Sequence, residues 1–154
     1  MWVPPEDKDP TLLMAPTRKS VSLFGAVNIR SGTLVTQSEK EKFNALTFMR
    51  FLVFLLRYRP RGKKMVIILD NAKYHHAVIL HPFLRKHVRT LSLEFLPAYS
   101  PDLNPIERVW KLTRKLCTHN TYFDHLDDLI EAVARQHALW AEPNETLRKL
   151  CCIS

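Results

Sequence analysis

The sequence has little cysteine and no long hydrophobic run. Its three cysteines, Cys117, Cys151 and Cys152, are odd in number and unpaired in spacing, which argues against a disulfide framework. The longest apolar stretch, residues 51–56, falls far short of the ~18 residues that a membrane span needs. Residues 1–10 contain no apolar signal core. These absences predict a protein without membrane contact in the reducing cytoplasm.

Negative charge is also scarce. The 154 residues carry 23 Lys and Arg against 15 Asp and Glu, a formal charge of +8. Apolar residues make up 46% of the chain, so a folded domain with its own core is expected rather than disorder. The basic balance favours a polyanionic partner such as nucleic acid, although a basic soluble protein of another kind would show the same charge.

Apolar patterning predicts alternating strands and helices after a proline-rich start. We expect residues 1–17 to be irregular, residues 18–142 to form the domain and residues 143–154 to be a C-terminal tail. The expected strands are residues 20–30, 33–37, 65–69 and 91–96, and the expected helices are about 38–59, 72–87, 104–117 and 124–140. A leading hairpin followed by this alternation predicts an α/β fold with a mixed sheet flanked by helices.

Several local signals refine these elements. Gly25 marks either a bulge or a close backbone approach within the first strand. Ser38 and Glu41 have capping-box spacing, and Pro60 should stop the helix that they begin. Residues 65–69 are continuously apolar, which predicts a central strand covered on both faces.

Two acids stand where rigid elements would fix them. Asp70 directly follows the strand at 65–69, and ligands of open α/β sheets bind at the carboxyl ends of strands. Glu107 falls in the first turn of the helix that Asn104 would cap and Pro105 would begin. Two such carboxylates, brought together by a fold, can hold divalent metal ions for phosphoryl transfer.

Each acid also has a structural interpretation. An Asp-Asn pair commonly closes a strand with a turn, and this explains Asp70 about as well. For Glu107 the spacing alone favours a capping-box role at the helix start. Asn71 would orient an acid or a bound water, and His75 and His76 would approach a phosphate, but surface or packing roles suit these histidines better.

Basic residues form two clusters. One surrounds the turn before the strand at 65–69 and comprises Arg57, Arg59, Arg61, Lys63 and Lys64. The other lies beside Glu107 and comprises Arg108, Lys111, Arg114 and Lys115. Contacts of this kind to phosphates give affinity without reading sequence. A solvated face is the alternative for both clusters and the better one for the first, whereas the second neighbours the candidate metal site.

Two sequence strings resemble a known family. Residues 68–72, Ile-Leu-Asp-Asn-Ala, are followed by His75, and residues 95–110 read Phe-Leu-Pro-Ala-Tyr-Ser-Pro-Asp-Leu-Asn-Pro-Ile-Glu-Arg-Val-Trp. Both are similar to the signature of mariner-like insertion-sequence transposases of the DDE superfamily. Residues 21–28 resemble the second strand of that family. The resemblance covers nearly the whole chain, and it overturns the purely structural interpretation of Glu107.

The resemblance implies an RNase H-like fold in which Asp70 is the second catalytic acid and Glu107 the third. Both would be ligands of Mg²⁺ or Mn²⁺. The first acid would lie on an upstream strand, which we expect to be missing together with the family's helix-turn-helix region. Asp7 and Asp9 lie in a proline-rich stretch without a strand pattern, so neither is assigned to the first position.

The resemblance implies metal-dependent DNA cleavage and strand transfer, with transposon ends and target DNA as partners. In a bacterial source, these partners would associate the protein with the nucleoid. The chain would be the C-terminal catalytic part of a larger transposase, inactive alone and completed by an upstream segment. The alternative is a non-catalytic remnant that retains DNA binding or self-association. The residues at hand leave its status as an enzyme undecided.

Overall fold

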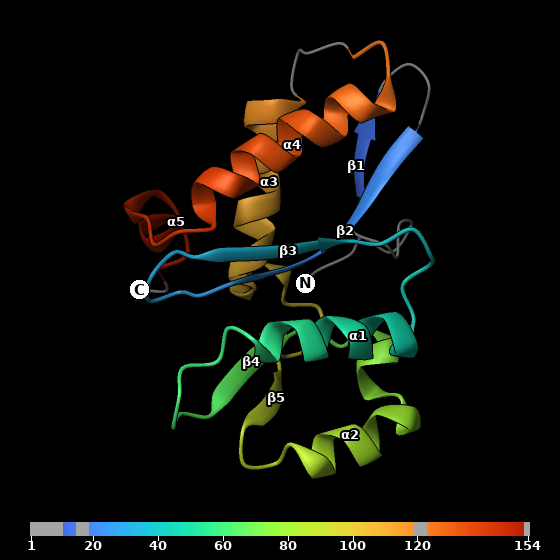
Figure 1. Cartoon of the computed structure of the whole chain (residues 1–154), viewed down its shortest axis with the longest axis vertical. Coiled ribbons are helices and arrows are strands. Elements are labelled where there is room, and N and C mark those ends of the chain that lie inside the picture. The colour runs from blue at the N-terminus through green and yellow to red at the C-terminus, as the bar shows by residue number, and fades with distance from the viewer. Residues whose placement is uncertain (1–10, 15–18, 119–122, 153–154) are drawn as a thin grey trace. The chain divides into compact units, whose positions relative to one another are not determined.

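The computed structural model describes residues 11–14, 19–118 and 123–152, which divide between two compact units (Figure 1). Unit 1 combines Met1–Ser38 with Pro105–Ser154, and unit 2 is the continuous segment Glu39–Asn104. None of the helices in the described ranges is both long and apolar enough to cross a membrane.

Unit 1 is built on an antiparallel three-stranded sheet. Its strands β1 (Thr11–Met14), β2 (Lys19–Val27) and β3 (Leu34–Ser38) lie in the order β1-β2-β3. The hairpin of β2 and β3 confirms the sequence prediction, with Leu23 opposite Ser38 and Val27 opposite Leu34. Strand β1 falls within the segment that was expected to be irregular.

Two helices pack on this sheet, α3 (Pro105–Cys117) and α4 (Leu126–Trp140). The residues that α3 buries are Pro105, Ile106, Val109, Trp110, Thr113 and Cys117. Leu116 of α3 and Ile130 of α4 are exposed, although both are apolar. The α3 side chains therefore set the position of the helix against the sheet.

At Gly25, strand β2 lies very close to helix α3. A Cβ atom at Gly25 would lie 2.5 Å from Cη2 and 2.6 Å from Cζ2 of Trp110. Strand pairing continues through Gly25, which lies opposite Thr36, so the glycine marks a close approach and not a bulge.

The C-terminal segment is folded. Residues 143–154, expected as a tail, include helix α5 (Glu145–Leu150), whose Leu147 is buried. The Asn144 side chain caps α5 by accepting from the Leu147 amide at 2.8 Å, and it donates to the Gly32 carbonyl at 2.8 Å. A side chain at Gly32 would collide with the Asn144 carbonyl oxygen, 2.2 Å from the Cβ position. The hairpin turn and the start of α5 therefore fit together only with glycine at this position.

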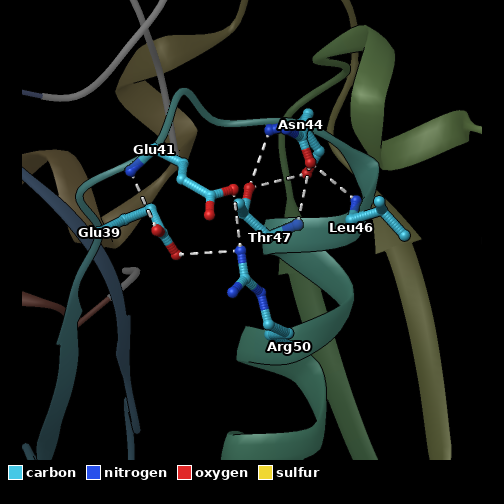
Figure 2. Close-up of polar contacts among 6 residues, drawn as sticks. All are labelled: Glu39, Glu41, Asn44, Leu46, Thr47 and Arg50. Carbon is cyan, nitrogen blue, oxygen red and sulfur yellow. Dashed lines mark hydrogen bonds and ion pairs between the residues drawn. The ribbon is translucent and has the colours of Figure 1, made fainter.

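Unit 2 begins with helix α1 (Ala45–Leu56), whose cap differs from the predicted one. The Asn44 side chain accepts from the Leu46 amide at 2.9 Å and from the Thr47 amide at 3.0 Å (Figure 2). The Thr47 hydroxyl in turn accepts from the Asn44 amide at 2.8 Å, which completes a capping box. The prediction of a Ser38–Glu41 box was wrong because Ser38 is the last residue of β3.

The second half of α1 buries one face and leaves another exposed. The buried residues of the helix are Thr47, Phe48, Phe51, Leu52 and Leu55, while Val53 is 49% exposed. The helix ends at Leu56, three residues before the predicted end at 59. Amides of the next turn donate to its last carbonyls, Arg57 to Phe54 and Tyr58 to Leu55.

The remaining strands of unit 2, β4 (Met65–Leu69) and β5 (Leu91–Phe95), form a parallel pair. Val66 and Ile68 are 56% and 49% exposed, so the expectation that β4 is covered on both faces was wrong. The opposite face holds the buried Leu69 and Leu91. Because the strands are parallel, their carboxyl ends lie together at one edge.

The segment between β4 and β5 is less helical than expected. It consists of two 3₁₀ turns, η1 (Lys73–His76) and η2 (Val78–Leu80), followed by the short helix α2 (His81–Lys86). Pro82 lies in the first turn of α2, where its missing amide hydrogen costs nothing, so a helix can begin there. Another 3₁₀ turn, η3 (Pro101–Leu103), precedes Asn104.

Candidate active site

Asp70 lies at the carboxyl end of β4 with its side chain held on two sides. Its Oδ1 atom accepts a hydrogen bond from the Ala72 amide at 3.2 Å. The same Oδ1 lies 3.0 Å from Nδ1 of His75. The side chain is 18% exposed, so the carboxylate is oriented yet still reached by solvent. The bond to the Ala72 amide is the turn that the Asp-Asn pair predicted. The contact with His75 is a partner that the sequence did not identify.

His75 is a buried support for that carboxylate. Only 3% of the residue is exposed, and its ring lies 4.5 Å from the rings of both Phe48 and Tyr74. Its Nδ1 also lies 3.0 Å from the backbone oxygen of Asp70. Both partners are oxygen acceptors, so Nδ1 carries the hydrogen. Packing against α1 therefore fixes the ring, and the ring fixes the acid.

The surroundings keep Asp70 ionised. Burial alone would raise the pKa of this carboxyl, because a charge is poorly solvated there. The hydrogen bond and the charge of His75, with the Ala72 amide, act in the opposite direction. The net result is a pKa below the ordinary value. An ionised carboxylate is the form that binds a divalent cation.

Asn71 joins the carboxyl ends of the two parallel strands. Its Nδ2 donates to the Leu96 carbonyl at 2.6 Å, and its Oδ1 lies 3.1 Å from Nε2 of His76. The His76 ring stacks on Phe95 with centroids 4.0 Å apart. Asn71 therefore links the ends of β4 and β5 next to Asp70. Its side chain bonds to Leu96 and His76 and not to the acid.

Glu107 belongs to unit 1, where it lies half-buried in the first turn of α3. The helix N-terminus favours a negative charge at this position. The buried α3 residues beside it, among them Ile106 and Trp110, hold the first turns in place. Asp70 lies in unit 2 and Glu107 in unit 1, each next to well-packed residues. A site that combines the two acids stays a prediction.

The basic residues of α3 divide into two groups. Arg108 donates through Nη1 to the carbonyls of Leu150 and Cys152, both at 3.1 Å. These carbonyls stand at the C-terminal end of α5, so Arg108 fastens α5 to α3. Lys111, Arg114 and Lys115 are exposed, and their contact with DNA stays a prediction. Because its guanidinium already binds two backbone carbonyls, Arg108 is the least available of the four predicted DNA-contacting residues.

The described residues contain only part of a metal ligand set. Within residues 11–14, 19–118 and 123–152, no group of three or more His, Cys, Asp or Glu side chains is placed to hold a metal ion. Asp7 and Asp9 lie outside these residues. The carboxylates of Asp70 and Glu107 are nevertheless hard oxygen ligands, the type that Mg²⁺ and Mn²⁺ prefer.

The chain, an α/β protein with an acid at the end of a parallel strand, has an RNase H-like fold, which the comparison with solved structures identifies. It matches the crystal structure of the catalytic domain of Mos1 mariner transposase with a TM-score of 0.67 and 21% identity, covering 92% of this chain and 71% of that one. It also matches the Mos1 strand transfer complex with a TM-score of 0.64 and 22% identity, covering 98% of this chain and 44% of that one.

The chain belongs to the DDE superfamily endonuclease family, whose sequence model matches residues 1–130. A curated relative, the uncharacterized protein y4pE/y4sA of Sinorhizobium fredii (strain NBRC 101917 / NGR234), is 39% identical over 69 residues. The match covers 45% of this chain and 47% of the relative, so the chain spans about half the length of that protein.

Proposed function

We propose that this chain is the C-terminal catalytic part of a DDE transposase, with Asp70 and Glu107 as its second and third acids. The observation that carries the proposal is the oriented, ionised carboxylate of Asp70 at the carboxyl end of β4. Membership of the DDE endonucleases supplies the reaction class, cleavage of a phosphodiester bond. DNA, as transposon ends and target, would be the substrate, and the cytoplasm is the compartment we propose.

The two acids suit a divalent cation. Bound Mg²⁺ or Mn²⁺ would activate a water or a 3′-hydroxyl and stabilise the leaving oxygen of an in-line displacement. His75 holds one carboxylate oxygen of Asp70, and the Ala72 amide keeps the same oxygen from rotating away. The first turn of α3 directs Glu107. Lys111, Arg114 and Lys115 would attract the phosphate backbone close to Glu107.

The reaction would be incomplete with these residues alone. A DDE site needs three acids, and the described residues supply no third carboxylate to the set. We therefore propose that the chain binds metal weakly and neither nicks nor joins DNA by itself. The second candidate, a non-catalytic remnant that binds DNA or associates with itself, is favoured by this same incomplete ligand set.

Nicking of supercoiled plasmid distinguishes the two candidates. The assay compares the chain alone, the chain extended by the coding sequence upstream of Met1, and the extended protein with Asp70→Asn. We expect Mg²⁺-dependent nicking only from the extended protein, and its loss with Asp70→Asn. Asp102→Asn, an exposed acid of the same unit, serves as the matched control and should nick normally.

Two results would contradict the proposal. Nicking by the extended protein that survives Asp70→Asn would remove Asp70 from the site. Metal-dependent nicking by the chain alone would show that an acid within it, Asp7 or Asp9, supplies the third ligand. An extended protein that binds DNA but never nicks it would instead support the non-catalytic candidate.

A further inference from the structure

The positive charge of the chain is concentrated in unit 2. Glu39–Asn104 contains 12 Lys and Arg against 5 Asp and Glu, a formal charge of +7 out of +8 for the whole chain. Within this unit, no acid lies between Glu41 and Asp70 or between Asp70 and Glu94. Two short segments in these acid-free stretches carry eight of the cations. Residues 57–64 lead into β4 and residues 85–90 lead into β5, and we call these two segments the connections.

The parallel strand pair brings the two connections together. Met65 opens β4 opposite Leu91 of β5, and the Met65 amide donates to the Thr90 carbonyl at 2.8 Å. Both connections therefore enter the strands from the same end (Figure 1). We define the strand-entry surface by the eight cations of these connections. They are Arg57, Arg59, Arg61, Lys63, Lys64, Arg85, Lys86 and Arg89.

These cations are available to a partner. Seven of the eight are exposed, and Arg59 is partly buried because its guanidinium donates to the Lys63 carbonyl and holds the turn. Among the described residues, none of the eight forms an ion pair. Arg50 shows the contrast, because its Nη2 lies 3.2 Å from Glu41 and 4.0 Å from Glu39 (Figure 2). Charge is thus compensated at the start of α1 and left uncompensated at its end.

We propose that the strand-entry surface is a second DNA-binding site, which holds duplex DNA by its phosphates. Eight like charges without a compensating acid repel one another, and a polyanion relieves that repulsion. Duplex DNA presents one negative charge per about 1.7 Å of helix axis, which suits several exposed cations gathered at one end of a strand pair. A surface of one sign is complementary to a partner of the opposite sign, and the phosphates of duplex DNA supply that charge at regular intervals.

This surface is separate from the candidate active site. Asp70 follows the last residue of β4, whereas the cations precede the first, so they lie at opposite ends of a strand about 17 Å long. The DNA segment bound at the strand-entry surface is therefore different from the segment whose phosphate would react at Asp70. It is either a distant part of the same duplex or a second duplex, and the site reads no sequence because it touches only phosphates.

Salt dependence of DNA binding tests the assignment. Affinity of the full chain for a short duplex is measured in EDTA from low to high salt, with Arg61→Gln, Lys63→Gln and Lys64→Gln combined in one variant. The control variant combines Lys40→Gln, Lys42→Gln and Arg50→Gln, which removes the same charge from the segment before α1 and from its first half. Arg59 is kept in both because it holds the turn.

We expect the strand-entry variant to flatten the log–log salt slope by about 1.8 to 2.7, the effect of two or three lost phosphate contacts. The control should change the slope by less than a third of that amount. An equal loss in both variants would show that net charge alone matters, and an unchanged slope in the first would remove the site. Tighter binding of an RNA duplex of the same sequence would also contradict a DNA site. Since no metal is present, failure here leaves the plasmid-nicking test of Asp70 intact.

Discussion

The Nδ1 atom of His75 lies 3.0 Å from the Oδ1 atom of Asp70. Five positions separate the two residues in the chain, and the 3₁₀ turn η1 folds the histidine back beneath the acid. Because His75 is buried against Phe48 of α1, the carboxylate depends on the packing of unit 2 as a whole. The direction of one acidic side chain is thus coupled to a hydrophobic core.

Replacing His75 with phenylalanine should release Asp70. The variant His75→Phe keeps an aromatic ring against Phe48 and Tyr74 but removes the hydrogen bond. We expect the pKa of Asp70 to rise and the free energy of unfolding at pH 7 to fall by about 2 kcal/mol, typical of a hydrogen bond to a charged group. Carboxyl carbon NMR titration and urea unfolding measure the two effects.

The pH dependence gives this prediction a sign. The lowered pKa of Asp70 contributes stability that is present above its ordinary value of 3.8 and is lost as pH falls through the folded-state pKa. His75→Phe should therefore lose less stability than the natural chain on acidification below pH 3.8. His75→Asn, which keeps a nitrogen donor near Nδ1, should restore part of the shift. An Asp70 pKa that is identical in all three proteins would show that His75 does not hold the acid.

His137 should make unit 1 sensitive to mild acid. The side chain is buried in α4 with its Nε2 3.1 Å from the Thr113 hydroxyl, and burial lowers its pKa to about 4. The unfolded chain binds a proton near pH 6.5 and the folded chain only near pH 4. Stability is therefore complete above pH 6.5 and falls between these values by about 1.4 kcal/mol per pH unit, on the order of 3 kcal/mol in all.

The variant His137→Leu removes this titration. Its free energy of unfolding should vary much less between pH 6.5 and 4 than that of the natural chain, as measured by urea unfolding at several pH values. His81→Asn, at an exposed position, is the control and should keep the natural slope. Equal slopes for the natural chain and His137→Leu would count against a depressed pKa.

Gly25 and Trp110 should be energetically coupled. A methyl group at Gly25 would overlap the Trp110 ring, so Gly25→Ala should destabilise the protein by roughly 1–3 kcal/mol. Trp110→Phe shortens the ring and opens the space. The double variant should therefore be more stable than the sum of the two single effects predicts, as measured by a urea double-mutant cycle. Additive effects would mean that the two residues do not compete for space.

Elements with strong local signals were predictable from the sequence. The apolar run at β4 stops at Asp70, and α3 begins at Pro105 as its proline predicts. The hairpin of β2 and β3 follows from the two apolar stretches at the start of the domain. These signals also placed Asp70 at a strand end and Glu107 in a first helical turn. The position of each acid on its own element was therefore predictable.

Features that depend on competition or distant contacts could not be predicted. The Ser38–Glu41 and Asn44–Thr47 pairs have the same spacing, and only the pairing of Ser38 with Leu23 in the sheet decides between them. The bond from Arg108 to Leu150 joins residues 42 positions apart. The contact of His75 with Asp70 needs the 3₁₀ turn that follows β4, and no periodicity distinguishes such a turn from a weak helix.

Broadening of amide NMR signals by Mn²⁺ tests the assignment of Asp70 and Glu107 most directly. At low Mn²⁺ we predict that the amides of Asn71 and Ala72, next to one acid, and of Arg108, next to the other, broaden first and together. Asp70→Asn should reduce the broadening at all three, because one ion is shared. Broadening that begins instead at Asp127 and Asp128, or that persists at Arg108 when Asp70 is replaced, would contradict a common metal site.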